Sequence, residues 1–183
     1  MSRIRLLFGI AFLCLLAQGC IFSPHKGGKV PPPPVVYQLP TSPEVVLANL
    51  KLAYTHKDST EYKSLYHASY QGSFIDQRDP SPVLATYFKT DEAAHIAFLA
   101  QSTASVDLLV SNSLVRIIDS GDPVGWITIQ NPFSKLEIDG DRGNVDIVPG
   151  TEDSIIMKFV PIPPGGGVPD TTWQIIRVIE SRS

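Results

Sequence analysis

The chain has 183 residues, which is enough for one folded domain and short for two. Hydrophobic residues make up 43% of the chain, a proportion typical of a globular protein and not of a disordered one. The formal net charge is −3, and no stripe of lysine and arginine is present to neutralise phosphates, so the composition argues against nucleic-acid binding.

The first 19 residues have the parts of a secretory signal. Arg3 and Arg5 precede Leu6–Ala17, an apolar run shorter than the roughly 20 residues that a membrane-spanning helix needs. The run ends in the sequence LAQGC, which closes on Cys20 and resembles the lipobox of bacterial lipoproteins. The resemblance implies that residues 1–19 are removed and that Cys20 becomes the lipid-carrying N-terminus. The alternative is an ordinary cleaved signal that happens to be followed by a cysteine.

Lipidation of Cys20 has two further implications. Cys14 would leave with the signal, so the mature domain would contain no thiol, as suits an oxidising compartment. Ile21 stands where an inner-membrane retention signal would carry aspartate, and by resemblance to the lipoprotein sorting rule this favours the outer membrane. We therefore expect an outer-membrane lipoprotein that faces the periplasm or the cell surface.

Residues 20–40 are predicted to form a tether. Pro31–Pro34 favours polyproline II, and Gly27-Gly28 loosens the chain before it. No apolar period of a helix or a strand runs through the segment. A spacer between membrane and domain is the expected role, and a proline-rich docking ligand for another protein is the alternative.

The expected domain, residues 41–183, opens with helices. Thr41-Ser42-Pro43-Glu44 offers a hydroxyl N-cap, a first-turn proline and an acid at the capping-box spacing. An apolar stripe at helical spacing follows. Asp58 or Ser59 is expected to cap a second short helix with Tyr62, Leu65 and Tyr66 on one face.

Two more helical segments are predicted before the strands begin. Ser81-Pro82 is expected to start a helical turn, and Thr90 to cap a longer helix over residues 91–101. The residues that would share the buried face of this longer helix are Ala93, Ile96, Ala97 and Ala100.

The hydrophobic pattern changes to strands after Ser102. Val106–Ile118 predicts one long extended run. The other expected strands are residues 125–130, 135–139, 144–148, 154–160 and 172–180. Helices followed by about six strands predict an α+β domain, in which the helices pack on one face of a curved antiparallel sheet. Such a sheet can leave a pocket between the two layers.

The opening segment resembles a known superfamily. A helix with Leu50 and Ala53-Tyr54 near its end, then Asp58 in a turn, then Tyr62 and Leu65, is similar to the start of nuclear transport factor 2-like proteins. This superfamily includes ketosteroid isomerase and SnoaL-like proteins, and it has a cystatin-like cone fold. The closing strand, with Trp173 at the start of an alternating apolar run, resembles the last strand of that fold.

The resemblance implies a set of pocket candidates. Ketosteroid isomerase-like enzymes place an acid and a tyrosine in the cone, because proton abstraction beside a carbonyl needs a base and an oxyanion donor. The polar residues of the segments that would line the cone are Tyr62, Tyr66, His67, Tyr70, Asp76 and His95. His67 as base and Tyr70 as donor is one catalytic hypothesis. No residue matches a family catalytic position, however, and tyrosines at helical spacing are more often core residues, so we assign no catalytic residue.

No metal or cofactor is predicted. His56, His67 and His95 are scattered, and no cysteine remains in the mature domain to complete a zinc site. Residues 139–150 suggest a calcium loop, but Gly150 stands where such a loop needs a bidentate glutamate. The sequence also contains no phosphate-binding, dinucleotide-binding or nucleophile-elbow motif.

Three functional hypotheses remain. The leading one is a non-catalytic, lipid-anchored envelope module that binds a small apolar ligand or an envelope protein. The first alternative is a small-molecule enzyme of the isomerase or dehydratase type that uses the cone pocket. The second is a structural component of an envelope assembly, in which the open sheet face would be an oligomer surface.

Overall fold

The computed structural model describes residues 34–140, 143–149, 153–165, 167 and 170–183. The chain divides into two units, Met1–Val35 and Val36–Ser183. The expected signal, Cys20 and most of the expected tether lie outside the described residues, and so does Gly150 of the suggested calcium loop. Within the described ranges, no helix is both long enough and apolar enough to cross a membrane. The fold below is that of the second unit.

Three helices lie among the described residues of this unit, and the caps of the first two are polar side chains. Helix α2 (Pro43–Thr55) begins after Ser42, whose side chain accepts a hydrogen bond from the amide of Val45, with proline in the first turn. Helix α3 (Ser59–Ser64) begins after Asp58, which caps the amides of the first turn. A hydroxyl cap was predicted for α2, but the capping-box spacing of Glu44 pointed to Thr41, and the cap is Ser42. For α3 the cap is Asp58, one of the two residues predicted.

Helix α4 (Lys89–Ala100) begins earlier than predicted and turns a different face inward. Its N-cap residue is Phe88, whose amide donates to the side chain of Asp91 at 2.7 Å, and not Thr90. The buried residues of the helix are Ile96 and Leu99, whereas Ala100 is exposed. The larger side chains take the core positions, because burying them removes more apolar surface from water than burying alanine does.

Nine strands are present among the described residues. They are β1 (Tyr66–Asp76), β2 (Ala85–Phe88), β3 (Ser105–Val110), β4 (Val115–Ile117), β5 (Ile127–Gln130), β6 (Phe133–Gly140), β7 (Gly143–Ile147), β8 (Asp153–Ile162) and β9 (Thr172–Arg182). They form a six-stranded sheet, sheet A, in the order β2-β1-β9-β8-β5-β4, and a three-stranded sheet, sheet B, in the order β3-β6-β7. Every pairing is antiparallel except that of β1 with β9, which is parallel.

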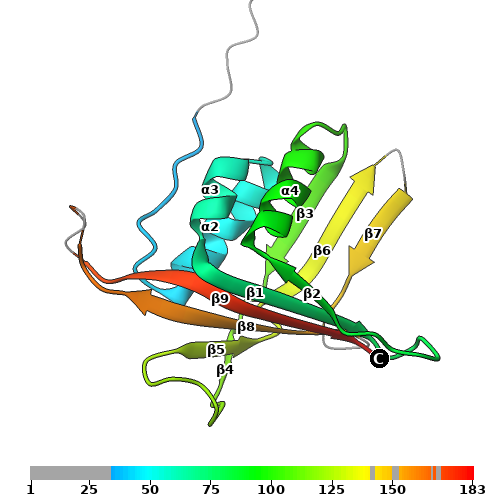
Figure 1. Cartoon of the computed structure of the whole chain (residues 1–183). Helices are drawn as coiled ribbons and strands as arrows, with labels where there is room; N and C mark the ends of the chain where they lie inside the picture. The colour runs from blue at the N-terminus through cyan, green and yellow to red at the C-terminus, as the bar shows by residue number, and fades with distance from the viewer. Residues whose placement is uncertain (1–33, 141–142, 150–152, 166, 168–169) are drawn as a thin grey trace, which may run out of the picture. The chain divides into compact units, whose positions relative to one another are not determined.

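The helices cover one face of the long strands of sheet A, and sheet B lies beside them (Figure 1). Helix α2 contacts both β3 and β9, and α4 contacts β1 and β2. The α+β class with helices on one face of a curved, mainly antiparallel sheet is thus confirmed. The main sheet has the expected six strands, and three further strands form sheet B, which the sequence did not predict.

The chain passes from sheet A to sheet B at Asn131. Its φ of +46° lies in the left-handed region, which asparagine tolerates better than most residues. Its amide donates to the carbonyl of Ile155 at 2.6 Å, and its Oδ1 accepts from the amide of Ile155 at 2.9 Å. This turn ties the end of β5 to β8 while β6 leaves for the other sheet.

Three further expectations are corrected. Val106–Ile118 is not one extended run, because β3 and β4 belong to different sheets and Ser111–Leu114 separates them. Ser81-Pro82 lies in bends before β2 and starts no helix. Tyr66 begins β1 instead of ending the second helix, and the register of β1 on β9 shifts between Tyr66 and Gln71.

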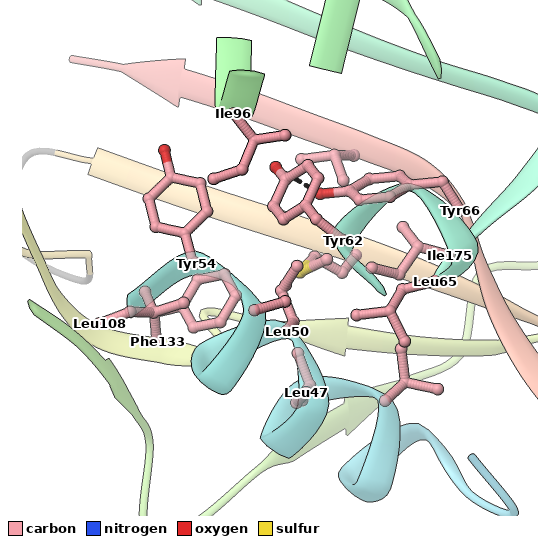
Figure 2. Close-up of a cluster of buried hydrophobic side chains, with 14 of the residues drawn as sticks. Leu47, Leu50, Tyr54, Tyr62, Leu65, Tyr66, Ile96, Leu108, Phe133 and Ile175 are labelled. Carbon is pink, nitrogen blue, oxygen red and sulfur yellow. Dashed lines mark hydrogen bonds between the residues drawn. The ribbon is translucent and has the colours of Figure 1, made fainter. Parts of the chain in front are cut away.

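A buried cluster of aromatic and aliphatic side chains joins the layers (Figure 2). Leu47 and Leu50 of α2 lie against Leu65, which follows α3, and Ile175 of β9. The predicted stripe of α2 is buried along its whole length.

Two polar groups fasten peripheral segments to this core. Asn49, only 1% exposed, accepts a hydrogen bond from the amide of Gln38 and donates one of 2.6 Å to its carbonyl. Lys158 points away from the buried Met157 and Phe159 on either side of it, and it contacts Asp119 and Asp122 at 2.5 Å each. The first pair holds residues 36–40 on the domain, and the second holds the loop between β4 and β5 across the outer face of β8.

Candidate functional site

A cavity of about 460 Å³ lies between the helices and the two sheets. Its apolar wall comes mainly from sheet B and β8 and includes Leu108, Leu136, Ile147 and Met157. Its polar end comes from α3, α4, β1, β2 and β9. The volume is in the range of sites that hold small organic molecules.

Exposed residues mark where the cavity meets solvent. Asp91 and His95 of α4 and Val145 of β7 all line it, and all three are exposed. The cavity therefore has a mouth between α4 and β7.

Glu92 is the central polar group of the cavity. It lies one turn before Ile96 on α4, and helical spacing brings both residues to the same side of the helix. Tyr62 donates a hydrogen bond to Oε2 of Glu92 at 2.8 Å, and Tyr70 donates one to Oε1 at 2.8 Å. Two hydroxyls from different elements therefore bridge one carboxylate.

The hydrogen-bond chain continues to a third tyrosine. The hydroxyl of Tyr66 donates to that of Tyr62 at 2.8 Å, as the dashed line in Figure 2 shows. The ring of Tyr66 lies 5.0 Å from that of Tyr62 and meets that of Tyr70 edge to face at 4.7 Å. Burial raises the pKa of all three hydroxyls, so they stay protonated and act as donors.

A second carboxylate, Glu180 of β9, lies at the same end of the cavity. The hydroxyl of Tyr87 donates to its Oε1 at 2.6 Å. Tyr87 pairs directly with Gly72 across β1 and β2, and a Cβ on Gly72 would lie only 2.1 Å from the tyrosine ring. Glycine at position 72 is therefore what lets the ring lie flat over β1 and reach Glu180.

Both carboxylates are held where the charged form is disfavoured. Burial raises the pKa of Glu92, although the hydrogen bonds from Tyr62 and Tyr70 oppose the shift. Burial also raises the pKa of Glu180, and the charge of Glu92 adds to the effect. No lysine or arginine is among the described residues that line the cavity.

His95 forms the remaining polar contact. Its Nε2 lies 2.6 Å from the hydroxyl of Tyr54, and the two rings stack with centroids 5.9 Å apart. Partial burial against α2 lowers the pKa of the imidazole. At neutral pH the ring is therefore uncharged, and its Nε2 can accept a hydrogen bond from the hydroxyl of Tyr54.

The six candidates from the sequence divide into three groups. Tyr62, Tyr66 and His95 line the cavity. Tyr70 is buried behind them and bonds to Glu92. His67 and Asp76 are not brought to the cavity.

The positions of those two residues on β1 explain why. The ring of His67 accepts from the amide of Ser69 at 3.1 Å, in the irregular part of the strand. Asp76 ends the strand and pairs with Arg78 at 2.9 Å, which lowers the pKa of this carboxyl to about 2. Neither residue therefore supports the hypothesis of a catalytic acid–base pair.

Glu92, Glu180 and Tyr87 are functional candidates that the sequence reasoning missed. The available signal was periodicity: Glu92 precedes Ile96 by four positions, and Glu180 follows Ile176 and Val178 at strand spacing. In both segments the glutamate falls on the apolar face. An acid at such a position is unusual, because burying a carboxylate is costly unless it is paired.

A metal centre is not formed by the described residues. No group of three or more histidine, cysteine, aspartate or glutamate side chains lies close enough within them to hold an ion. Cys20 lies outside the described residues.

Comparison with known proteins places the fold in a class. No protein-family model matches the chain, and no curated protein sequence matches it. Solved structures do match, among them a Novosphingobium aromaticivorans protein provisionally assigned as the beta subunit of an aromatic-ring-hydroxylating dioxygenase. It is 12% identical, with a TM-score of 0.50, over 76% of this chain and 86% of that one.

Two further matches carry the same fold name. One is a provisionally assigned dehydratase of the NTF2-like family from Streptomyces avermitilis, 11% identical, with a TM-score of 0.47, over 76% of this chain and 92% of that one. The other is an NTF2-like protein with a cystatin-like fold from Novosphingobium aromaticivorans, 12% identical, with a TM-score of 0.42, over 75% and 77%. The match at a TM-score of 0.50 agrees with the α+β fold, in which helices pack on one face of a curved, mainly antiparallel sheet. The resemblance to NTF2-like proteins stays a prediction from the opening segment.

Proposed function

We propose that the protein is a lipid-anchored module of the bacterial envelope that binds a small molecule in the cone cavity without transforming it. The observation that carries the proposal is the cavity itself, about 460 Å³ with an apolar wall and a polar end. A cavity of this kind is the usual form of a small-molecule site.

The arrangement around Glu92 favours binding over catalysis. A general base needs a lone pair directed at the substrate. Each oxygen of this carboxylate already accepts a hydroxyl, from Tyr62 on one side and Tyr70 on the other. Those hydroxyls in turn point at the carboxylate and not at a position where a substrate carbonyl would lie.

The isomerase or dehydratase alternative has one observation in its favour, a buried carboxyl of raised pKa in the cavity. It requires a lone pair of Glu92 that accepts no tyrosine hydroxyl to be directed at the substrate. If incubation with a bound ligand leaves that ligand unchanged by mass spectrometry, the catalytic alternative is contradicted.

Native mass spectrometry of the full chain purified from envelopes tests the binding proposal. We expect a small molecule to co-purify with the wild type and to be lost from Leu136→Trp, whose larger ring would fill the cavity. The matched control is Leu109→Trp, because Leu109 is exposed on the opposite face of β3. Loss from both variants, or retention by both, would contradict the proposal.

The envelope location rests on the sequence of the first twenty residues and has its own test. Labelled palmitate should enter the wild type and Cys14→Ser but not Cys20→Ser. Cys14 provides the control, because it lies in the apolar run that would be removed. Label in both variants or in neither would refute lipidation at residue 20.

The structural alternative is supported by the loop between β4 and β5. Ile118 and Val124 on this loop are fully exposed, which is unusual for large apolar side chains. Crosslinking in native envelopes separates this role from the first. A protein partner that is retained by Leu136→Trp and lost from Ile118→Asp would favour assembly over small-molecule binding.

A further inference from the structure

The polar end of the cavity holds carboxyl groups, and no lysine or arginine side chain is among the described residues that line it. The ionisable groups that line it, apart from tyrosines, are Asp91, Glu92, Glu180 and His95. Arg182 lies near Glu180, but its guanidinium contacts Asp153 at 2.8 Å. The side-chain hydrogen bonds described to Glu92 and Glu180 come from neutral tyrosine hydroxyls.

The two carboxyl groups, Glu92 and Glu180, therefore leave room for a cationic group of a ligand to pair with them. Buried carboxylates normally pair with a cation, because their desolvation is otherwise only partly offset. Burial raises the pKa of both glutamates here, and a cation placed between the helix α4 side and the β9 side would reverse that shift.

Aromatic rings surround the same region. Tyr54, Tyr62, Tyr66, Tyr70 and Tyr87 follow one another with 4.7 to 6.3 Å between successive ring centroids. Figure 2 shows the first three beside each other over the core. All but Tyr70 line the cavity. Tyrosine rings attract ammonium groups through their negative faces, and aromatic cages with acidic residues recognise organic cations in this way.

We infer that, provided the cavity binds a small molecule as proposed above, its ligand is an organic cation. The ammonium group lies between Glu92 and Glu180 among the tyrosine rings. An apolar body of the ligand fills the remainder of the cavity against Leu108, Leu136 and Met157.

Three probes that share the adamantyl group and differ in their polar group test the inference: 1-adamantylamine, 1-adamantanol and 1-adamantanecarboxylate. They are titrated calorimetrically into the full chain in phosphatidylcholine nanodiscs at neutral pH, with empty nanodiscs as the blank. The amine is expected to bind about tenfold or more tightly than the alcohol, and the carboxylate least tightly.

Substitutions assign the preference to the two acids. Glu180→Gln and Glu92→Gln should each reduce the ratio of amine to alcohol affinity while leaving the affinity for the alcohol nearly unchanged. Glu137→Gln is the matched control, because it removes the same charge outside the cavity. Glu137 lies on β6 between Leu136 and Ile138, which line the cavity, so its side chain lies on the opposite face of the strand. Glu180→Gln keeps the test decisive if Glu92→Gln does not fold.

Each outcome has a distinct meaning. Equal affinity for amine and alcohol, or tighter binding of the carboxylate, overturns the cation inference and leaves the binding function standing. The same is true of an amine preference that survives both cavity substitutions or is lost equally in Glu137→Gln. Binding of none of the three probes overturns the binding function and the inference together.

Discussion

The chain of tyrosine hydroxyls that ends on Glu92 predicts that Tyr62→Phe and Tyr66→Phe lower the free energy of unfolding by very different amounts. In Tyr62→Phe, the hydroxyl in the middle of the chain is removed. In Tyr66→Phe, the hydroxyl at its outer end is removed. Both side chains are buried, and both variants keep the aromatic ring. Any difference in stability therefore reports on the hydrogen bonds and not on packing.

The magnitudes follow from what each hydroxyl does. Loss of the Tyr62 hydroxyl removes a bond to a carboxylate, about 1.5–3 kcal/mol, and leaves the Tyr66 donor without its acceptor, about 1–3 kcal/mol more. Loss of the Tyr66 hydroxyl removes one neutral bond, about 1 kcal/mol, because Tyr62 keeps Glu92 as its acceptor. We expect Tyr62→Phe to cost about 2.5–6 kcal/mol and Tyr66→Phe about 1 kcal/mol.

Urea unfolding of the full chain in nanodiscs measures the difference. The two tryptophans of the chain, Trp126 and Trp173, lie in the domain, so their fluorescence reports on its unfolding. Tyr37→Phe is the control, because that hydroxyl bonds to Asp58 at 3.1 Å outside the cavity, and we expect a loss below about 1 kcal/mol. Equal losses in Tyr62→Phe and Tyr66→Phe would refute the chain of hydrogen bonds described above.

Three more predictions concern other parts of the domain. The folded pKa of Glu180 lies above the unfolded value of 4.5, so its stabilising contribution is complete below that pH and is lost as the pH rises through the folded pKa. Glu180→Gln should therefore gain stability relative to the wild type as the pH rises above 4.5, by about 1.4 kcal/mol per unit of pKa difference, and parallel profiles would contradict this. Asp122→Asn should cost about 2–3 kcal/mol in thermal unfolding, because it removes one of the two charges that compensate the buried Lys158; an unchanged melting temperature would argue against the pair. Asn49→Ala leaves both backbone groups of Gln38 without their partner. Limited proteolysis should then cut residues 36–40 faster than in the wild type. An unchanged cleavage rate would show that other contacts hold this segment.

Local signals predicted the first two helices well, whereas the helical turn at Ser81-Pro82 and the cap at Thr90 were wrong. The caps at Ser42 and Asp58 and the apolar stripe of α2 depend on residues within a few positions of one another, and all three are present in the structure. Strand β1 was missed for a reason that its own residues explain. Tyr62, Tyr66 and Tyr70 recur at a helical spacing, although only the first lies on a helix, and the irregularity of β1 between Tyr66 and Gln71 obscures the alternation of a strand.

The site was less predictable, because its parts come from separate elements. Glu92 belongs to α4, Tyr87 to β2 and Glu180 to the last strand, and only the assembled sheets bring them to one cavity. A single glutamate on a helix is normally solvated, so sequence reasoning has no cause to select it. The same reasoning selected His67 because histidine is chemically versatile, whereas the strand places that side chain away from the cavity.

The position of β9 between β1 and β8 has a consequence for how the protein folds. Without β9, sheet A separates into the pair β2-β1 and the trio β8-β5-β4, each with an unpaired edge. The strand that joins them is the last to be synthesised, and it also delivers Glu180. A nascent chain therefore cannot close sheet A before β9 is made. The pairing of β1 with β9 joins segments about a hundred residues apart, and such long-range pairing is intrinsically slow. A chain truncated before residue 172 should therefore be prone to aggregate through these open edges.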